Sequence, residues 1–406
     1  KKKRNNLKTD SFYIKRGREM PSEILSSKFS KRRLTAVESR LSFPGEIWSF
    51  SRVGNPVCVN AAVVRSAYDR CVGGTHSDWL ADKDNPHGWK SYDEAIEKSV
   101  YKALDMRKKN LCHGLPFGGV KFTIFSEEPL VNELRVYAYK ILGEALNFFK
   151  GRVYTGADVH TNTTDLMLAF GVSPYVLGLD QEYGGSGDPS PQTAIGVHKA
   201  IKEFFSIFHA DSKMHGKRVN IKGIGKVGYP LLKLLYDDGF NIGIADIRHE
   251  VVEEARDRFR GVERLSEDTI HTKYAHVYTP CDKEVTITPE NIAEICDSSS
   301  DHKWRAIIGS ANDQNRHGSE LEDALWKRRV VHLSQGGYLE NGGGVITVVA
   351  PLIGGFDWKK WLALKIDALA RTSSEIMFEA RETNVAPARI VSMMIDRLAR
   401  ETGNEL

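Results

Sequence analysis

Two lysines, Lys109 and Lys121, stand on either side of a glycine-rich stretch, residues 114–119 (GLPFGG). Proline removes a backbone donor and glycine costs conformational entropy, so the chain must bend between the lysines. In one small volume, one lysine could bind a carboxylate while the other, disfavoured as a cation by its neighbour and by a dry pocket, acts as a general base. Two exposed lysines in a basic turn are the simpler interpretation of this stretch taken alone.

A second group of residues predicts a dinucleotide site. Residues 218–222 (RVNIK) have the pattern of a strand, and a GxGxxG motif, residues 223–228 (GIGKVG), follows at the start of a helix. The next strand, residues 240–245, ends in Asp246, at about the 20-residue spacing expected for an acid that contacts an adenosine ribose. Asp246 would repel a 2′-phosphate and favours NAD, while Arg248 keeps NADP open. A glycine-rich turn that binds nothing is the alternative.

The segments around the lysines are expected to position them. Residues 57–64 alternate like a strand, residues 71–75 (CVGGT) predict a tight turn whose amides could meet an anion, and residues 77–89 form a polar insertion that could act as a lid. Residues 91–94 (SYDE) are typical of a capping box that begins a helix. The apolar face of this helix is expected to consist of Ile96, Val100, Ala103 and Leu104.

Downstream of the lysines, a helix is predicted at roughly residues 131–149, followed by a run, residues 152–158 (RVYTGAD), that ends in Asp158. Residues 184–191 (GGSGDPSP) predict a linker because Gly, Ser and Pro accumulate there. A helix from residue 193 to about residue 209 comes next. Alternating strands and helices after it predict a parallel sheet.

Composition limits the classes of function. The 406 residues are 41% hydrophobic and 27% charged, which is typical of a soluble globular protein, and the length predicts two domains. The net charge is +4 without a long basic stripe, so neither nucleic acid nor a membrane is expected as a partner. The five cysteines lack a CxxC pair or a histidine cluster at ligand spacing. We therefore expect no metal site and no disulfide framework, and a reducing, cytoplasmic compartment.

The predicted fold class is α/β with two domains and the active site in the cleft between them. Residues 41–190 would form an N-terminal substrate (dimerisation) domain, and residues 191–360 a Rossmann dinucleotide-binding domain. Residues 1–40 would be a basic arm, and residues 361–406 would be helices that pack back at the domain junction.

Ordered blocks of the sequence resemble the Glu/Leu/Phe/Val dehydrogenase superfamily, in particular its leucine, phenylalanine, valine and tryptophan dehydrogenase branch. The resemblance covers residues from about 57 to 348, and so many blocks in one order are far harder to obtain by chance than any single motif. The blocks are GGT at Gly73, the lysine pair, TGAD at Thr155, SGDPSPQTAIGV at Ser186, the dinucleotide motif, PC at Pro280, GSAN at Gly309 and NGGGVI at Asn341.

The resemblance implies an oxidoreductase that uses NAD for the reversible oxidative deamination of an L-amino acid to a 2-oxo acid and ammonia. Lys109 would hold the substrate carboxylate, Lys121 would activate water and stabilise the carbinolamine, and Asp158 would carry protons to and from the amino group. Thr193 would lie near the nicotinamide, and Asn341 beside the substrate end of the cofactor. Further implied residues are Val72, Gly73, Gly74, Gly156, Val345 and Val348 for the substrate, and Gly223, Gly225, Lys226, Val227, Gly228, Asp246, Ile247, Ala311 and Asn312 for the cofactor.

The implied side-chain pocket is apolar. Val72 stands where the glutamate enzymes of the superfamily have a lysine that pairs with the second carboxylate of the substrate, and Val345 and Val348 are pocket positions on one helix face. Glutamate should be rejected, because its carboxylate would be buried without a partner. Gly156 resembles the phenylalanine- and tryptophan-using members, so aromatic amino acids are expected ahead of aliphatic ones. Alternatively, Gly156 only relaxes the turn before Asp158.

The sequence departs from the family pattern at His76 (arginine in the family), Val120 (glycine), Lys226 (asparagine) and Asp313 (asparagine). Asp313 matters most, because an acid there would repel the substrate carboxylate, although Asn312 could substitute if the loop shifts. The chain ends soon after its last amphipathic helix, so a homodimer is expected rather than an octamer.

Two other functions stay open. One is a diverged relative that binds dinucleotide as a sensor or scaffold without deaminating, and the other is a biosynthetic enzyme of the same fold that acts on a modified amino or oxo acid. Retention of Lys109, Lys121 and Asp158 favours a working enzyme, because a non-catalytic relative has no physical reason to maintain costly buried charges.

Overall fold

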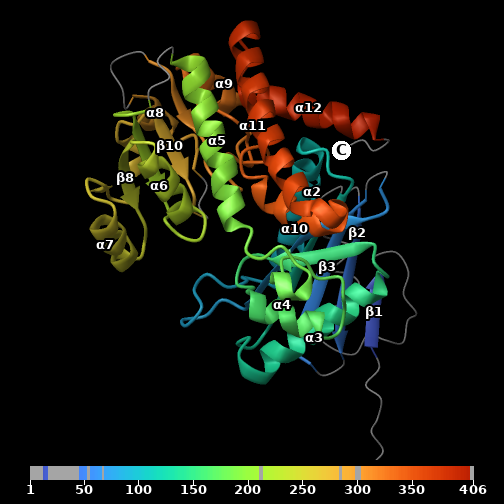
Figure 1. Cartoon of the computed structure of the whole chain (residues 1–406). Helices are drawn as coiled ribbons and strands as arrows, with labels where there is room; N and C mark the ends of the chain where they lie inside the picture. Colours follow the sequence, from blue (N-terminus) through green and yellow to red (C-terminus); the bar gives the residue numbers. More distant parts are fainter. Residues whose placement is uncertain are drawn as a thin grey trace, which may run out of the picture.

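The structure is a computed structural model that describes residues 12–16, 45–52, 55–65, 68–209, 214–282, 286–297 and 303–402. Within these residues the chain forms two sheets of six strands each, with helices on their faces and between them (Figure 1). The predicted two-domain α/β fold is therefore confirmed, whereas the bounds given for the domains remain a prediction. The expected basic arm, residues 1–40, lies outside the described residues except for strand β1 (Phe12–Arg16).

The first sheet is mixed. Its other elements are β2 (Glu46–Arg52), β3 (Val57–Val64), β4 (Cys71–Trp79), α2 (Tyr92–Cys112), β5 (Gly118–Ser126), α3 (Asn132–Phe148), β6 (Val153–Ala157) and α4 (Thr163–Phe170). The strand order is β1-β2-β3-β5-β4-β6. Pairing is antiparallel from β1 to β5, and β4 is parallel to both β5 and β6.

Strand β3 shows how both faces of this sheet are covered. All its residues are buried, and successive side chains point to opposite faces. Val57, Val59, Ala61 and Val63 share an apolar cluster with α3, and Cys58, Ala62 and Val64 share one with α2. The predicted strand is thereby confirmed. Helix α2 begins where expected because the Ser91 hydroxyl accepts from the amide of Glu94.

The tight turn predicted at residues 71–75 is wrong, because this segment begins β4. A Cβ atom on Gly73 would lie 1.6 Å from the carbonyl oxygen of Val120 on β5, and one on Gly74 would lie 2.9 Å from Cβ of Asp158. Both positions need glycine because neighbouring groups approach the strand closely on either side. The glycine pair therefore marks close packing between strands, not a reversal of the chain.

The insertion predicted at residues 77–89 is only partly irregular. Ser77 to Trp79 complete β4, and the loop that follows ends at Trp89, which is buried and donates from Nε1 to the carbonyl oxygen of Ile124 at 3.0 Å. Residues 81–84, 86 and 87 are exposed. The hypothesis of a lid is therefore restricted to these residues.

The second sheet is parallel, as predicted. Its elements are β7 (Arg218–Lys222), α6 (Gly228–Asp237), β8 (Asn241–Ala245), α7 (His249–Arg258), β9 (Glu263–Arg264), β10 (Val277–Pro280), α8 (Ile292–Asp297), β11 (Arg305–Ile307), α9 (Ser319–Lys327) and β12 (Val330–His332). The strand order is β12-β11-β10-β7-β8-β9. Strand β7 has the bounds that the sequence predicts.

Four further helices connect the halves: α5 (Ser190–Phe208), α10 (Gly343–Ile353), α11 (Trp358–Thr383) and α12 (Pro387–Glu401) (Figure 1). Helix α5 begins three residues before the predicted start, because Pro191 suits the first turn of a helix. One apolar cluster joins Val72 and Leu177 of the first half to Val345 of α10 and Leu369 of α11. Short 3₁₀ helices occur at Gln181–Tyr183, Ile270–Thr272 and Gly355–Asp357. Among the described helices, none is long and apolar enough to cross a membrane.

Candidate active site

Lys121 and Asp158 form an ion pair across the first sheet. Lys121 is buried in β5, in register with Gly74 of β4, and its Nζ donates to Oδ2 of Asp158, which follows β6. Gly74 has no side chain that would separate them. Burial acts to raise the pKa of Asp158, but the charge and hydrogen bond of Lys121 outweigh it and lower that pKa to about 2. The carboxylate is therefore ionised at neutral pH.

Lys109 lies in the last turn of α2, and the chain bends through residues 113–117 before β5 begins. The bend predicted between the lysines is thus confirmed. Nζ of Lys109 donates to Oδ1 of Asn312 at 2.9 Å. Burial and the charge of Lys102 lower the pKa of Lys109 to about 8, while the charge of Asp158 acts in the opposite direction. Lys109 is still mainly cationic at neutral pH, and Asp158 lies within electrostatic range of it.

Asn312 connects the two halves of the site. Its Oδ1 accepts from Lys109 on α2 and from Nδ2 of Asn341, which lies just before α10, at 2.9 Å each. Nδ2 of Asn341 also donates to the carbonyl oxygen of Ser310 at 3.1 Å, whereas its buried Oδ1 has no hydrogen-bond partner among the described residues. A buried acceptor without a donor is costly, so this oxygen marks a place where a ligand donor fits.

Asp313 is neutralised by two cations. Its Oδ1 accepts from Nζ of Lys102 at 2.7 Å, and its Oδ2 pairs with Arg316. Burial acts to raise the pKa of Asp313, but these cations lower it below its usual range. The repulsion of a substrate carboxylate expected from the sequence is therefore weakened. Asn312, not Asp313, contacts Lys109.

The sequence interpretation missed three residues that join α2 to the second half: Lys102, Asp105 and Tyr338. Nζ of Lys102 lies 3.4 Å from Oδ2 of Asp105, and the hydroxyl of Tyr338 donates to Oδ1 of Asp105 at 2.8 Å. Helical spacing is the signal that could have found the first two. Residues 102, 105 and 109 are three and four positions apart, so they share one face of α2.

The GxGxxG motif forms the turn between β7 and α6, as predicted. Gly223 has φ +87°, a conformation that glycine adopts without strain. A Cβ on Gly228 would lie 1.9 Å from the carbonyl oxygen of Gly223, so packing alone requires this glycine. A Cβ on Gly225 would meet nothing closer than 3.7 Å, so the backbone there is open to a pyrophosphate. Lys226 is exposed, and Val227 is half-buried.

Asp246 follows β8, as predicted, and its carboxylate is already engaged. It accepts from the amide of Ile224 at 2.9 Å, and from the amide (3.0 Å), Nε (3.0 Å) and guanidinium nitrogen (3.1 Å) of Arg248. Ile247, between the acid and the arginine, is 80% exposed. A ribose would have to share or displace the Arg248 contact. Arg248 therefore bears directly on the choice between NAD and NADP.

Thr193 and Ala311 lie close to the segment that carries Asn341. Thr193 is buried in the first turn of α5, and a Cβ on Gly344 would lie 2.9 Å from its hydroxyl oxygen, so it faces the first turn of α10. The amide of Ala311, in the loop after β11, donates to the carbonyl oxygen of Pro280 at 3.0 Å. Thr193 thus lies against α10, and Ala311 lies at the end of β10.

Three residues expected to form the side-chain pocket, Val72, Val345 and Val348, belong to or border one apolar cluster that also contains Leu177. Val72, Leu177 and Val345 are buried in it, and Val348 packs against it. A Cβ on Gly156 would come no closer than 3.4 Å to the backbone of Leu177, which is ordinary contact. The fold itself does not require glycine at residue 156, so the absent methyl leaves space.

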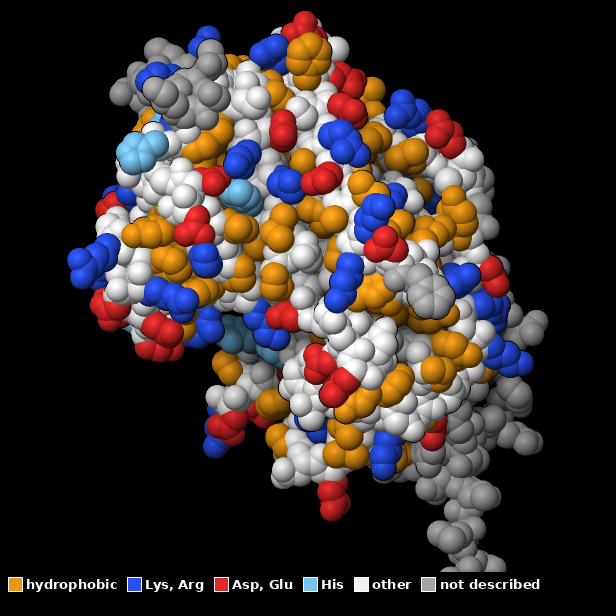
Figure 2. Space-filling model, in the orientation of Figure 1, with side chains coloured by type: hydrophobic (Ala, Val, Ile, Leu, Met, Phe, Trp, Pro, Cys, Tyr) orange, Lys and Arg blue, Asp and Glu red, His pale blue; other side chains and the backbone are white. Residues whose placement is uncertain are grey.

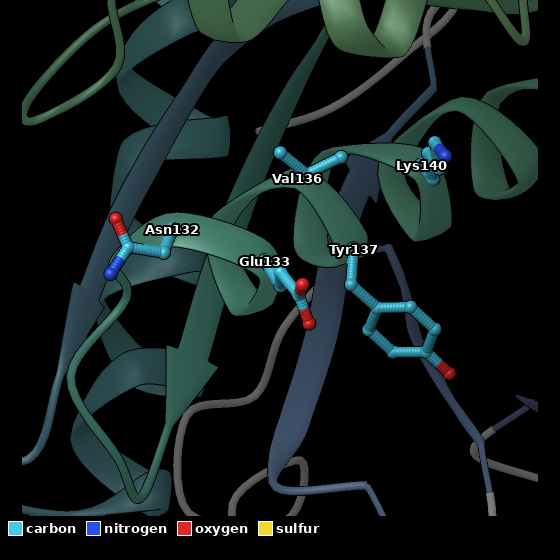
Figure 3. Close-up of a pocket in the computed structure, with 5 residues that line it drawn as sticks. All are labelled: Asn132, Glu133, Val136, Tyr137 and Lys140. Atoms are coloured by element: carbon cyan, nitrogen blue, oxygen red, sulfur yellow. The ribbon is translucent and has the colours of Figure 1, made fainter.

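A hollow (Figure 2) and a separate pocket occur on the molecular surface. The face in Figure 2 is hollowed between the lobe that carries α7 and the lobe below it, and histidine side chains are visible there. A separate pocket lies on one side of α3, and its lining contains none of the residues predicted for the site (Figure 3). The lining residues are Asn132, Glu133, Val136, Tyr137 and Lys140.

Comparisons with known proteins agree with this fold. A scan against protein-family models finds no match. The phenylalanine dehydrogenase of Thermoactinomyces intermedius is 30% identical over 317 residues, which are 77% of this chain and 82% of that protein. The leucine dehydrogenase of the same organism is 32% identical over 267 residues, 65% of this chain and 69% of that protein. The crystal structure of L-tryptophan dehydrogenase from Nostoc punctiforme has a TM-score of 0.68 at 20% identity and covers 90% of this chain and 99% of that chain.

The two-domain fold and these relatives place the protein among the amino acid dehydrogenases, oxidoreductases that act on a CH–NH₂ group. Within this class, the chain belongs to the leucine and phenylalanine dehydrogenase family of the Glu/Leu/Phe/Val dehydrogenase superfamily. The resemblance drawn from the sequence blocks is confirmed.

Proposed function

We propose that the protein is an NAD-dependent dehydrogenase that reversibly deaminates an apolar, preferably aromatic, L-amino acid. The reaction takes the amino acid, NAD⁺ and water to a 2-oxo acid, ammonium, NADH and a proton. The main support for the proposal is the proximity of Lys109, Lys121 and Asp158. Lys121 donates to Asp158, and the charge of Asp158 acts on Lys109. Lys109 also contacts the loop after β11 through Asn312, so this neighbourhood adjoins the dinucleotide sheet.

The roles follow from charge and reach. Cationic Lys109 binds the substrate carboxylate, which takes over the contact that Asn312 makes in the structure. Ionised Asp158 accepts a proton from the substrate ammonium, so that the nitrogen lone pair can form the imine as hydride leaves Cα. Lys121 and Asp158 share a hydrogen bond along which a proton can pass. Lys121 can thereby serve the attack of water on the imine and the loss of ammonia.

NAD⁺ supplies the hydride acceptor, and the residues present fit it. Gly225 leaves the backbone open to a pyrophosphate, and Asp246 lies where a ribose acceptor is needed. Oδ1 of Asn341 is buried and unpaired among the described residues, so it suits a donor on the cofactor or the substrate.

An aromatic substrate is supported by the pocket. Val72, Val345 and Val348 lie in or against one apolar cluster, where a glutamate carboxylate would lose its hydration without a cation to replace it. The space at Gly156 accommodates a ring better than a pocket filled by a methyl group.

The proposal is tested by NADH formation from phenylalanine, tryptophan, leucine and glutamate, each with NAD⁺ and with NADP⁺. We expect kcat/KM to be highest for an aromatic amino acid with NAD⁺ and lowest for glutamate. Glutamate as the best substrate would contradict the pocket. Dinucleotide binding without turnover of any amino acid would favour a sensor or scaffold, and turnover only of a modified amino acid would favour a biosynthetic role.

A further inference from the structure

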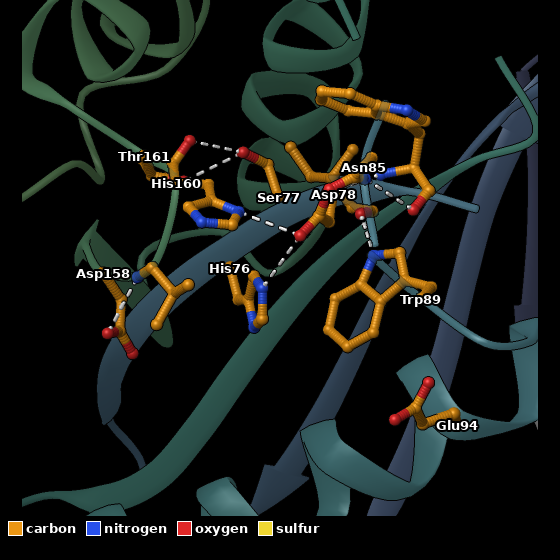
Figure 4. Close-up of polar contacts among 12 residues, drawn as sticks. His76, Ser77, Asp78, Asn85, Trp89, Glu94, Asp158, His160 and Thr161 are labelled. Atoms are coloured by element: carbon orange, nitrogen blue, oxygen red, sulfur yellow. Dashed lines mark hydrogen bonds and ion pairs between the residues drawn. The ribbon is translucent and has the colours of Figure 1, made fainter. Parts of the chain in front are cut away.

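Three side chains of metal-ligating types come together beside the proposed site, although none has a role in the proposed reaction (Figure 4). His76 and Asp78 are two residues apart on β4, so they share a face of the sheet. His160 follows β6, two residues after Asp158. The ligand atoms of the three all lie within 4.8 Å of one another.

One of these atoms lacks a hydrogen-bond partner among the described residues. Oδ2 of the buried Asp78 accepts from Nδ1 of His160 at 2.8 Å, and the same oxygen lies 3.8 Å from Nε2 of His76. That second distance is too long for a hydrogen bond. Nε2 of His76 is left without a hydrogen-bond partner among the described residues, although His76 is only 7% exposed. The unpaired nitrogen is directed at the carboxylate that His160 also contacts (Figure 4).

The three side chains are held in place by the residues around them. Oδ1 of Asp78 accepts from Nδ2 of Asn85 at 2.8 Å, and the His76 ring packs on Trp89 with ring centroids 4.3 Å apart. His160 has φ +54°, which places its backbone in the left-handed region, and its carbonyl oxygen accepts from the hydroxyl of Ser77 at 2.7 Å. Such supporting contacts orient metal ligands in known sites.

We propose that His76 Nε2, Asp78 Oδ2 and His160 Nδ1 bind one divalent transition-metal cation of the Zn²⁺ class. Two imidazoles and one carboxylate suit Zn²⁺ or Co²⁺, whereas Mg²⁺ and Ca²⁺ prefer oxygen ligands alone. Ligands held about 2.0–2.2 Å from one ion lie roughly 3–4 Å apart, so small side-chain shifts bring these atoms into place. Three protein ligands leave a coordination position open to water or to a ligand.

Electrostatics does not oppose a cation here. Asp78 supplies a buried negative charge, and the ammonium of Lys121 is paired with Asp158. The charges of Lys121 and Lys98 act against a positive charge at His76, whereas the charge of Asp158 favours it, so the surrounding charges partly offset one another. The side chain of His160 is 45% exposed, so an ion can reach the site from solvent. The sequence predicted no metal site because Asp78 and His160 are 82 residues apart and only the adjacency of β4 and β6 brings them together.

The test is a titration of the full-length, chelator-treated protein with Zn²⁺ and with Co²⁺, followed by calorimetry and by the visible absorption of Co²⁺. We expect saturation at one equivalent, Co²⁺ bands of a histidine-ligated site, and a rise in Tm on binding. His160→Asn should abolish this binding, and asparagine tolerates the left-handed backbone at that residue. Asn85→Ala should weaken it by roughly 10–100-fold, the usual cost of losing a ligand's supporting hydrogen bond.

His87→Ala is the matched control, because His87 is an exposed histidine of the adjacent loop and should bind no part of the ion. The Tm of metal-free His160→Asn, compared with the metal-free wild type, shows whether that variant folds. No saturable binding by the wild type would overturn the proposal, and so would full binding by folded His160→Asn. Equal losses in the His87 and His160 variants would also overturn it. The readout is metal binding, so it is independent of whether the proposed dehydrogenase activity is found.

Discussion

The two sheets of this protein present functional groups in different ways. After β7, the site is made of backbone: Gly223 takes a positive φ, and Gly225 leaves its peptide groups open. In the first sheet the site is made of side chains, since Lys121 on β5 meets Asp158 after β6 across Gly74 of β4. A backbone site depends on residue order over a few positions. A side-chain site depends on which strands are neighbours.

The largest effect should come from breaking the side-chain site. Lys121→Ala and Asp158→Asn should each lower kcat by roughly two or more orders of magnitude, because each removes a group that moves a proton in the proposed reaction. Dinucleotide affinity should stay unchanged, since the backbone site is intact. Steady-state kinetics and NADH binding measure both quantities. Lys140→Ala, on the exposed side of α3, is the control, and near-native kcat in either site variant would remove that residue from the mechanism.

The substrate pocket offers the next effect. Gly156→Ala should lower kcat/KM for phenylalanine relative to leucine by roughly tenfold, because one methyl group in a pocket is worth about 1–3 kcal/mol. The fold should tolerate the change, since the added Cβ would come no closer than 3.4 Å to Leu177. An unchanged ratio with an unchanged Tm would show that Gly156 does not line the pocket.

Substitutions at two glycines of the turn after β7 should distinguish an effect on NAD⁺ binding from an effect on stability. Gly225→Ala should raise the KM for NAD⁺ by roughly tenfold, equivalent to about 1.4 kcal/mol, at an unchanged Tm, because its Cβ would meet no protein atom closer than 3.7 Å but would occupy space proposed for the pyrophosphate. Gly228→Ala should instead lower Tm, since its Cβ would lie 1.9 Å from the carbonyl oxygen of Gly223. Equal losses of Tm in both variants would contradict the distinction.

Carboxylate binding should weaken as the pH rises through about 8. Burial and Lys102 lower the pKa of Lys109 to about 8, so the cationic form dominates below that pH and is lost above it. A carboxylic acid without an amino group is the suitable probe, because it does not itself titrate in this range. The Kd of this acid should rise above pH 8 in the wild type. In Lys109→Gln the Kd should be larger than in the wild type at pH 7 and independent of pH. A flat wild-type profile would contradict the role of Lys109.

The smallest effect is expected at Asp313. If this acid repelled the substrate, Asp313→Asn would lower the KM for the amino acid. Because Lys102 and Arg316 neutralise it, we expect no improvement and at most a few-fold loss, as for a partly exposed ion pair worth about 0.2–1 kcal/mol. Lys102→Ala leaves the acid without its partner on α2 and should raise KM more than Asp313→Asn. A clear gain in amino-acid affinity in Asp313→Asn would support the repulsion that the sequence predicts.

The difference between the two sheets explains how much of the fold and of the site could be predicted from the sequence. Strand β7, the glycine turn and Asp246 follow from local order, and they are found as predicted. Gly73 and Gly74 were misinterpreted as a turn, because glycine signals both chain reversal and close packing, and only the neighbouring strands distinguish them. Asp105 and Tyr338 are 233 residues apart in the sequence, so no local pattern predicts their hydrogen bond.

The most direct test of the central claim is the fate of the hydrogen on Cα. L-Phenylalanine deuterated at Cα is incubated with NAD⁺ and the wild-type protein, and the NADH is examined by mass spectrometry. We expect one deuterium in each NADH, phenylpyruvate and ammonium in equal amounts, and greatly slowed NADH formation in Asp158→Asn. NADH without deuterium, or no NADH from any apolar L-amino acid, would contradict it.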